Sequence, residues 1–333
     1  GTRLWNSRVG FIAAIWLALD LNSLAFSMLA LTETLFTFFL ITFILFFVRL
    51  IHSEGEANVN RLSFAAGLFL AVATHIRPVS YYLVFPVLVG WLAWSLWQRW
   101  DYLSLMRSTL FFIFPLLFLL GGWQVRNFLI TGESVFSAIE SINMVNYRAA
   151  MVIAEREGGS RDDGMAWIRQ EYKLDTAPGW TKRWGNAGIN IILDNPGIFF
   201  RQYMRGLGNI FLGPGSERIG RLMGVVINIT SPLGDLFRLS PGEYLQRWVR
   251  PYPGYFLLFV FSLVHMFMLY VFSLWGLLRV PKILPTWFLV GVLFYLALIS
   301  AGPEAYSRFR VPITPILALF ASVGLDDFTF KKD

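Results

Sequence analysis

Long apolar stretches separated by short polar breaks fill most of this sequence. A run of about 20 apolar residues is long enough to cross the hydrocarbon core of a bilayer as a helix. The pattern therefore predicts an all-α membrane protein, a polytopic helical bundle with about eight transmembrane helices and a large external loop region. The helices are expected at residues 9–28, 31–51, 62–76, 78–97, 108–125, 254–278, 284–301 and 309–325.

The first apolar stretch is interrupted by Asp20, Asn22 and Ser23. Short polar side chains of this kind compete with helical hydrogen bonds. One interpretation is a single span over 9–28. The other is a span over 9–19 followed by a short interfacial or re-entrant piece over 21–30.

The middle of the chain changes character. Residues 123–252 contain 15 of the 28 basic and 12 of the 21 acidic residues, so this segment is expected outside the hydrocarbon. The sequence therefore predicts three parts. Residues 1–125 form about five transmembrane helices, residues 126–252 form an external loop region with amphipathic helices, and residues 253–333 form about three more transmembrane helices.

Two helical patterns stand out in the loop region, one over 165–172 and one over 189–211. Within the second, Asp194-Asn195-Pro196 is a helix-start signal. Aromatic side chains there alternate with Arg201 and Arg205, which favours a helix lying on the membrane surface. The alternative is a core helix of a small loop domain.

Composition narrows the function classes. The chain is 56% hydrophobic and only 15% charged, which is typical of a membrane protein. It has no cysteine, which excludes disulfides and thiolate metal sites, and its three histidines are scattered, which argues against a histidine zinc site. The net charge of +7 must first be sorted by side of the membrane, so no nucleic-acid partner is expected.

Basic residues in short loops give an expected orientation. Loops rich in arginine and lysine stay in the cytoplasm, and three such segments alternate correctly with the predicted helices. The protein is then a multi-pass protein of the inner (plasma) membrane whose active face is external, that is, periplasmic. The basic pairs that carry this argument are Arg3 and Arg8, Arg99 and Arg107, and Arg279 and Lys282.

Glu33 is the first candidate for chemistry. It lies at the external end of the second apolar stretch, where a carboxylate is costly unless it is solvated or paired. The structural alternative is an acid in the first helical turn, with Thr32 as N-cap. Arg77, before Pro78 on the same face, suits either bidentate phosphate binding or anchoring at the interface.

Further candidates lie on the same face. Arg126 follows the fifth apolar stretch, and Arg308 and Arg310 alternate with an aromatic residue just before the last one. Two such arginines can clamp an anionic lipid head group, with interface anchoring as the alternative. Asp162-Asp163, in a glycine-rich segment, suits either a divalent cation or an ordinary polar turn.

Four segments in this order resemble the polytopic lipid-linked-sugar glycosyltransferases of the C superfold, particularly bacterial relatives of the protein O-mannosyltransferases and the aminoarabinose transferase. Members of that family transfer a sugar from a polyprenyl-phosphate carrier to an acceptor at the external face of the membrane. The segments are residues 31–39 (LTETLFTFF), 66–78 (AGLFLAVATHIRP), 123–132 (WQVRNFLITG) and 308–317 (RFRVPITPIL).

The resemblance implies a hexosyl- or pentosyltransferase of the cell envelope. Its partners would be the polyprenyl-phosphate sugar, an acceptor glycan, lipid or protein, and membrane lipids. A divalent cation assists some members. Glu33 matches the second acidic position of the family, which organises the acceptor or metal side of the catalytic site. The residues implied to bind the donor phosphate are Arg77, Arg126, Arg308 and Arg310.

The sequence departs from the family at its start. The principal catalytic acid of the family lies in the first external loop, and the chain begins beyond that position, so we expect a segment upstream of Gly1 to hold it. A transporter or flippase for lipid-linked glycans would use the same arginines, but it needs polar residues deeper in the bilayer. A third alternative is a membrane scaffold with an external interaction domain. The scarcity of mid-membrane charge favours the enzyme.

Overall fold

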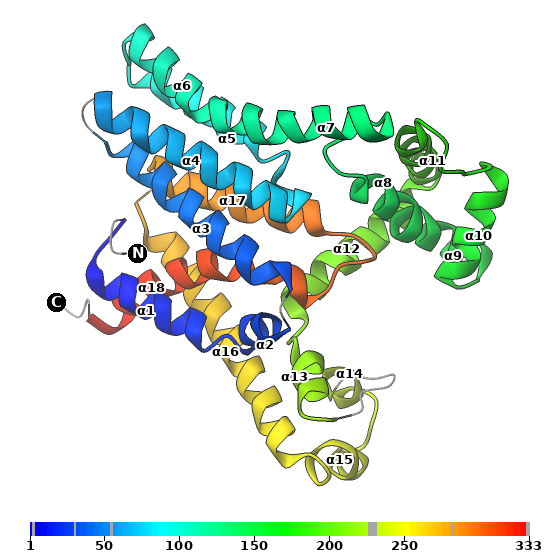
Figure 1. Cartoon of the computed structure of the whole chain (residues 1–333). Coiled ribbons are helices and arrows are strands. Elements are labelled where there is room, and N and C mark those ends of the chain that lie inside the picture. The colour runs from blue at the N-terminus through cyan, green and yellow to red at the C-terminus, as the bar shows by residue number, and fades with distance from the viewer. Residues whose placement is uncertain (2–3, 30, 54–55, 226–231, 282, 331–333) are drawn as a thin grey trace. The chain divides into compact units, whose positions relative to one another are not determined.

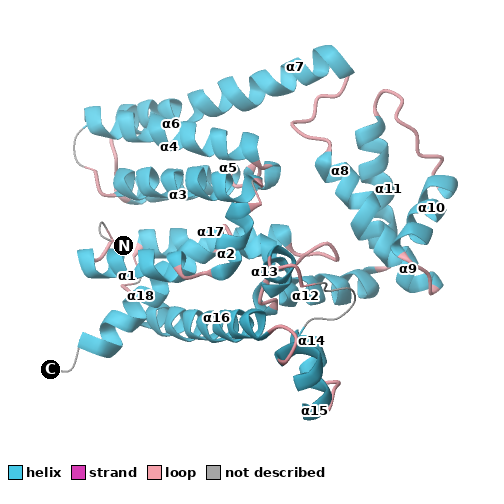
Figure 2. Ribbon diagram, turned by 60° about the horizontal axis from the view of Figure 1, so that its bottom comes forward, coloured by secondary structure: helices cyan, strands magenta, loops and turns pink. Residues whose placement is uncertain are grey.

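The computed structural model describes residues 1, 4–29, 31–53, 56–225, 232–281 and 283–330. Throughout these ranges the regular structure is helical and contains no strand (Figure 2). The all-α prediction is confirmed. Arg3 and Lys282, which contribute to the predicted orientation, lie outside the described residues.

The chain folds into two compact units that alternate along the sequence. Unit 1 contains Gly1–Thr34, Phe211–Leu293 and Ser307–Asp333, and unit 2 contains Leu35–Ile210 and Phe294–Tyr306. Neither unit coincides with one of the three predicted segments, and the boundaries of those segments stay a prediction.

Among the described residues, five helical segments are long and apolar enough to cross a membrane, or six if the bent pair α1 (Ser7–Ala18) and α2 (Leu21–Met28) counts as one span. The last two predicted helices correspond to α17 (Leu284–Ser300) and α18 (Thr314–Phe330), each of 17 residues. Eight spans therefore stay a prediction. The five segments, whose helices Figure 1 labels, are α3 (Thr32–Ile51), Asn58–Ile76 within α4 (Glu56–Ile76), Pro78–Trp97 comprising η1 (Pro78–Ser80) and α5 (Val84–Trp97), Tyr102–Thr131, and α16 (Pro253–Arg279).

Asp20 divides the first apolar stretch into two helices. Its carboxylate accepts hydrogen bonds from the backbone N–H of Ser23, at 3.0 Å, and from the Ser23 hydroxyl, so that Asp20 is the N-cap of α2. An N-cap residue leaves the helical conformation, and the two helices meet at 60°. The break is confirmed, but both interpretations stay open, since the bent pair fits one broken span as well as a span followed by a re-entrant piece.

The fifth apolar helix is longer than predicted. It runs without interruption through α6 (Tyr102–Leu116), the π-helical turn η2 (Leu117–Gly121) and α7 (Gly122–Thr131), and Gly132 ends it in the left-handed conformation. Its 30 residues correspond to about 45 Å, against about 30 Å for a hydrocarbon core. The helix continues past residue 125, where the span was expected to end, so Arg126 lies within the helix rather than beyond it, and the end of the span itself stays a prediction.

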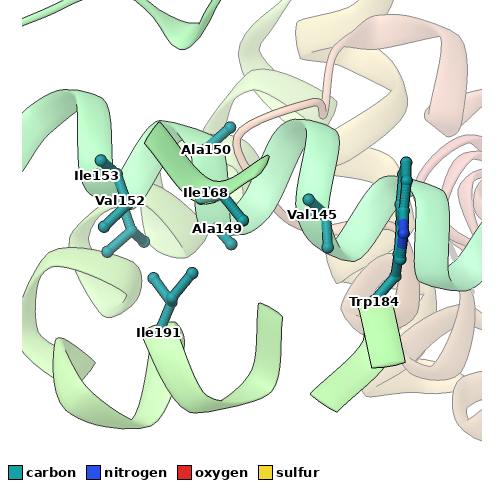
Figure 3. Packing of buried hydrophobic residues seen from close by; sticks show 8 residues of the cluster. All are labelled: Val145, Ala149, Ala150, Val152, Ile153, Ile168, Trp184 and Ile191. Atoms are coloured by element: carbon teal, nitrogen blue, oxygen red, sulfur yellow. The ribbon is translucent and has the colours of Figure 1, made fainter. Parts of the chain in front are cut away.

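Much of the charged middle region folds into a helical subdomain of unit 2. Its core, drawn in Figure 3, joins Val145, Ala149 and Ile153 to Ile168, Trp184 and Ile191. The predicted helix at 165–172 lies in α10. Its N-terminus is closed by a reciprocal capping box between Ser160 and Asp163, so the segment around Asp162-Asp163 is a polar turn and helix start. The subdomain comprises α8 (Ile139–Asn143), η3 (Met144–Ala149), α9 (Ala150–Glu157), α10 (Arg161–Glu171) and α11 (Trp180–Asp194).

The predicted helix over 189–211 is divided at Asn195 between α11 and α12 (Pro196–Leu212), which confirms the helix start at Asp194-Asn195-Pro196. One face of α12 is buried through Gln202, Gly206 and Ile210. Its exposed residues include Phe200 and Met204 as well as both arginines of the predicted surface helix. The helix therefore combines a packed face with an exposed face that carries apolar and basic side chains, and its place on a membrane stays a prediction.

A charged contact fastens α12 to α9. The Glu155 carboxylate accepts hydrogen bonds from Arg201 and Gln202, at 2.8 and 2.9 Å, and these bonds lower the pKa of Glu155 below its ordinary value. Arg148 makes a second link within unit 2, donating to Glu304 at 3.0 Å and to the Ile299 carbonyl at 3.3 Å.

Acid should loosen the contact between α9 and α12. A carboxyl whose pKa is lowered by folding stabilises the folded state above its ordinary pKa of 4.5, and this contribution disappears as the pH falls further. For an exposed pair the contribution is at most about 1 kcal/mol. The thermal midpoint should therefore fall less between pH 7 and pH 4 in Glu155→Gln than in the parent. Equal falls in both proteins would contradict the assignment.

In unit 1, the C-terminal acids pair with two of the arginines that give the predicted orientation. Asp326 lies 3.6 Å from Arg8, and Asp327 lies 3.3 Å from Arg279 and accepts a hydrogen bond from Trp275 at 3.3 Å. These acids offset part of the positive charge on which the orientation rests. The orientation stays a prediction.

The segment of unit 1 before α16 contains short helices around a small aromatic core made by Val225, Tyr244, Trp248 and Tyr255. Asp235, which is buried, lies 3.2 Å from Arg247 and accepts a hydrogen bond from Trp248 at 3.0 Å. The helices are α13 (Ser216–Leu222), α14 (Pro232–Leu236), α15 (Pro241–Tyr244) and η4 (Leu245–Val249).

Candidate functional site

A buried ion pair joins two of the predicted site residues in unit 1. Glu33, in the first turn of α3, accepts a hydrogen bond from the Nε of Arg308, which lies on the 3-10 turn η5 (Ser307–Arg310). The Glu33 side chain is 0% exposed and that of Arg308 is 27% exposed. A buried carboxylate needs such compensation, because desolvation strongly disfavours an isolated charge.

The local structure of α3 argues against a purely helix-capping role for Glu33. Thr32 is the first residue of the helix. An N-cap residue precedes the first helical residue, so Thr32 is not the N-cap. Acids that serve a helix start are usually solvated at the first turn, whereas Glu33 is enclosed and paired with a residue 275 positions away. A tertiary role therefore accounts for Glu33 better than helix capping alone.

Arg310 has a different environment from Arg308. It is 2% exposed, and its Nη1 donates to the carbonyl oxygens of Gly213 and Phe211, at 2.8 and 3.2 Å. The Tyr270 hydroxyl donates to the same Phe211 carbonyl at 2.6 Å. Arg310 thus fastens η5 to the end of α12, while Arg308 is the more accessible of the two guanidinium groups. Whether Arg310 also binds phosphate stays a prediction.

Asn22 adds a third segment to this cluster. It is fully buried on α2 and donates through Nδ2 to the Ser307 carbonyl at 3.0 Å. A Cβ at Gly215, whose φ is +72°, would lie 2.0 Å from the Asn22 Oδ1, so the backbone there approaches the amide closely. The sequence showed Asn22 as a polar break in an apolar run, and that break was the signal of its packing against η5.

His265 packs nearby in unit 1. It is buried near the middle of α16, and its Nε2 lies 3.1 Å from the Trp16 carbonyl, so that Nε2 carries the proton in this contact. Its ring centroid is 5.2 Å from that of Trp16. These contacts are those of a packed side chain.

Arg77 and Arg126 belong to unit 2, where their segments lie close together. His75, two residues before Arg77, lies 5.8 Å from the Trp123 ring, and the Arg126 guanidinium lies 4.6 Å from that ring on α7. Gln124 donates to the Tyr81 hydroxyl at 3.2 Å. Sequence reasoning missed Tyr81 and Gln124, because neither residue type is a specific signal in an apolar segment.

The five predicted site residues therefore form two groups, one in each unit: Glu33, Arg308 and Arg310 in unit 1, and Arg77 and Arg126 in unit 2. Their union in a single site stays a prediction. In the part of the chain that the structure describes, no three histidine or carboxylate side chains converge on a metal position. The donor set for a divalent cation is thus not supplied by these residues, and we assign no step to one.

No family model, curated protein or solved structure matches the chain. The likeness to lipid-linked-sugar glycosyltransferases consequently rests on the four sequence segments.

Proposed function

We propose that this protein is a membrane glycosyltransferase that moves a sugar from a polyprenyl-phosphate donor to an acceptor at the external face of the inner membrane. The observation that carries the proposal is the Glu33–Arg308 pair, a buried carboxylate bound to a partly exposed guanidinium. Both residues lie in segments that resemble the family. The five long apolar helices support a multi-pass setting.

The reaction calls for charges of both signs. An acceptor hydroxyl attacks the anomeric carbon, the bond from that carbon to the phosphate oxygen breaks, and polyprenyl phosphate leaves with the bonding electrons. A base takes the hydroxyl proton, and positive charge stabilises the departing phosphate. Arg308 suits the second task because a guanidinium matches phosphate geometry. Glu33 holds Arg308 through Nε and orients the acceptor side.

A transporter for lipid-linked glycans is the second candidate, and one observation favours it. The first apolar stretch is a broken helix with Asp20 at the break, and broken helices often surround substrate sites in transporters. Buried His265 supplies a polar group near the middle of α16. Movement of a labelled lipid-linked sugar across vesicles without release of polyprenyl phosphate would favour this function.

Glu33→Gln in the full-length protein should lower sugar transfer about a hundredfold or more, since the amide keeps the shape of the side chain but loses the charge that holds Arg308. The measurement is release of polyprenyl phosphate from a panel of polyprenyl-phosphate sugars.

Asp235→Asn is the matched control, because it removes the charge of another buried, arginine-paired carboxylate of unit 1. Its transfer rate should stay within about threefold of the parent, a difference of well under 1 kcal/mol. Unchanged turnover in Glu33→Gln, with the parental thermal midpoint, would show that Glu33 is structural.

A further inference from the structure

Unit 2 contains a cavity of about 290 Å³ that is distinct from the candidate site. It is lined by residues from the loop after α3, the first helical turns of α4 and α6, and the connection between α5 and α6. The polar and aromatic residues of its wall are Ser53, Asn60, Trp100, Asp101, Ser104 and Arg107.

The cavity lies where four apolar segments of unit 2 begin or end. The segments α3 and Pro78–Trp97 end beside it, and Asn58–Ile76 and Tyr102–Thr131 begin beside it. If these helices span the membrane, as the proposed function requires, their shared end lies at the level of the lipid head groups.

Tryptophan side chains mark the same level. Trp100 in the cavity wall lies 5.2 Å from Trp91 and 5.8 Å from Trp94, measured between ring centroids. Trp97 and Tyr102 are largely exposed beside them. Tryptophan and tyrosine gather at membrane–water interfaces, because their rings are apolar at one end and polar at the other.

The chemistry of the wall is zwitterionic. Asp101 and Arg107 place one negative and one positive side chain on the same small cavity, whose wall also includes the amide of Asn60 and two serine hydroxyls. Asp101 is held in place because it accepts a hydrogen bond from the backbone N–H of Ser104, at 3.2 Å, as the N-cap of α6.

We propose that this cavity binds the phosphoethanolamine head group of a phospholipid. Arg107 receives the phosphate, since a guanidinium binds phosphate oxygens with charge-assisted hydrogen bonds. Asp101 receives the primary ammonium, whose N–H groups also reach Asn60 and the serines. A phosphatidylglycerol head group would bring no cation for Asp101, and the quaternary ammonium of phosphatidylcholine has no N–H to donate.

Native mass spectrometry of the full-length protein with added phosphatidylethanolamine, phosphatidylglycerol or phosphatidylcholine tests the proposal. The ethanolamine lipid should bind about tenfold more tightly than either of the others, the ratio expected for about 1.4 kcal/mol. Equal binding of all three lipids would overturn the proposal.

Two variants and a control locate the site. Asp101→Asn keeps a good N-cap but removes the charge, so it should abolish the preference over phosphatidylglycerol while leaving the thermal midpoint unchanged. Arg107→Gln should weaken binding of all three lipids, because each of them carries a phosphate. Arg49→Gln, at the end of α3 but outside the cavity wall, should change neither the lipid preference nor the strength of binding.

A preference that persists in Asp101→Asn would overturn the assignment of the ammonium to that residue. These outcomes are independent of the transfer reaction, because none of the variants alters Glu33 or Arg308. If the protein does not transfer sugar, the lipid-binding measurement still tests the cavity. If the cavity does not bind the lipid, the proposed sugar transfer is unaffected.

Discussion

Arg308→Ala should destabilise the protein by about 3–5 kcal/mol, the cost typical of removing one partner from a buried ion pair. The Glu33 side chain is fully enclosed, so its charge would lose the guanidinium that offsets desolvation. The measurement is the free energy of unfolding in detergent, from titration with denaturant, together with the rate of sugar transfer. Both should fall.

The double variant Glu33→Gln/Arg308→Ala separates stability from function. It removes both charges, so its cost should be smaller than that of Arg308→Ala alone, with a coupling energy of about 1–3 kcal/mol. Transfer should stay absent in the double variant although the protein is folded. A cost of the double variant equal to the sum of the costs of Glu33→Gln and Arg308→Ala would show that the two side chains do not depend on each other.

Arg247→Ala provides the comparison within unit 1. Arg247 also pairs with a buried carboxylate, that of Asp235, but half of its own side chain is exposed and Trp248 donates to the same carboxylate. Its removal should lower stability without lowering the specific rate of transfer of the folded fraction. A loss of specific activity equal to that of Arg308→Ala would mean that charge removal anywhere in unit 1 inactivates the protein.

The sequence predicted that Glu33, Arg308 and Arg310 would lie on one face, and the structure brings all three into unit 1. It did not separate the two arginines, which alternate around one aromatic residue and look equivalent in a one-dimensional pattern. Their difference arises from distant backbone. The carbonyl oxygens that accept hydrogen bonds from Arg310 lie about one hundred residues earlier, at the end of α12. No local sequence pattern encodes that contact.

Helix ends were predicted well where the backbone itself marks them. Pro78 and Pro253 begin their segments within one residue of the prediction, because proline favours the first helical turn. The end of the fifth helix was missed because the polar residues Arg126 and Asn127 follow the apolar run, whereas the helix continues through them to Thr131. Asp20 signalled a break correctly because its side chain replaces a helical hydrogen bond.

The subdomain of α8 to α11 and the helix α12 that follows it were harder to predict from the sequence. The helices of the subdomain are short, and one π-helical turn, η3, joins α8 to α9. Ala149 and Ala150 fill core positions that a hydrophobic pattern does not distinguish from surface alanines. The pattern of aromatic residues in α12 did not reveal its buried face, which includes Gln202 and Gly206. Small and polar residues in a buried face are recognised only when their partners are known.

Gly276→Val should displace α18 from α16 and thereby disturb the Glu33–Arg308 site. A Cβ at Gly276 would lie 1.9 Å from the Phe320 carbonyl oxygen, and one at Gly324 would lie 2.2 Å from that of Phe272. Backbone cannot yield as a flexible side chain can, so overpacking should cost about 1–3 kcal/mol or more. Because η5 leads directly into α18, a shift of about 1 Å in Arg308 can lower turnover about a hundredfold.

Gly291→Val is the control for this substitution, since α17 is also an apolar helix and no atom lies within 4 Å of a Cβ placed there. Its thermal midpoint and transfer rate should match those of the parent, whereas Gly276→Val should lose both. The smaller change Gly276→Ala should give the same pattern with a partial loss. If Gly276→Val folds with the parental midpoint and transfers sugar at the parental rate, then α16 and α18 are not packed backbone to backbone, and the position of η5 does not depend on that contact.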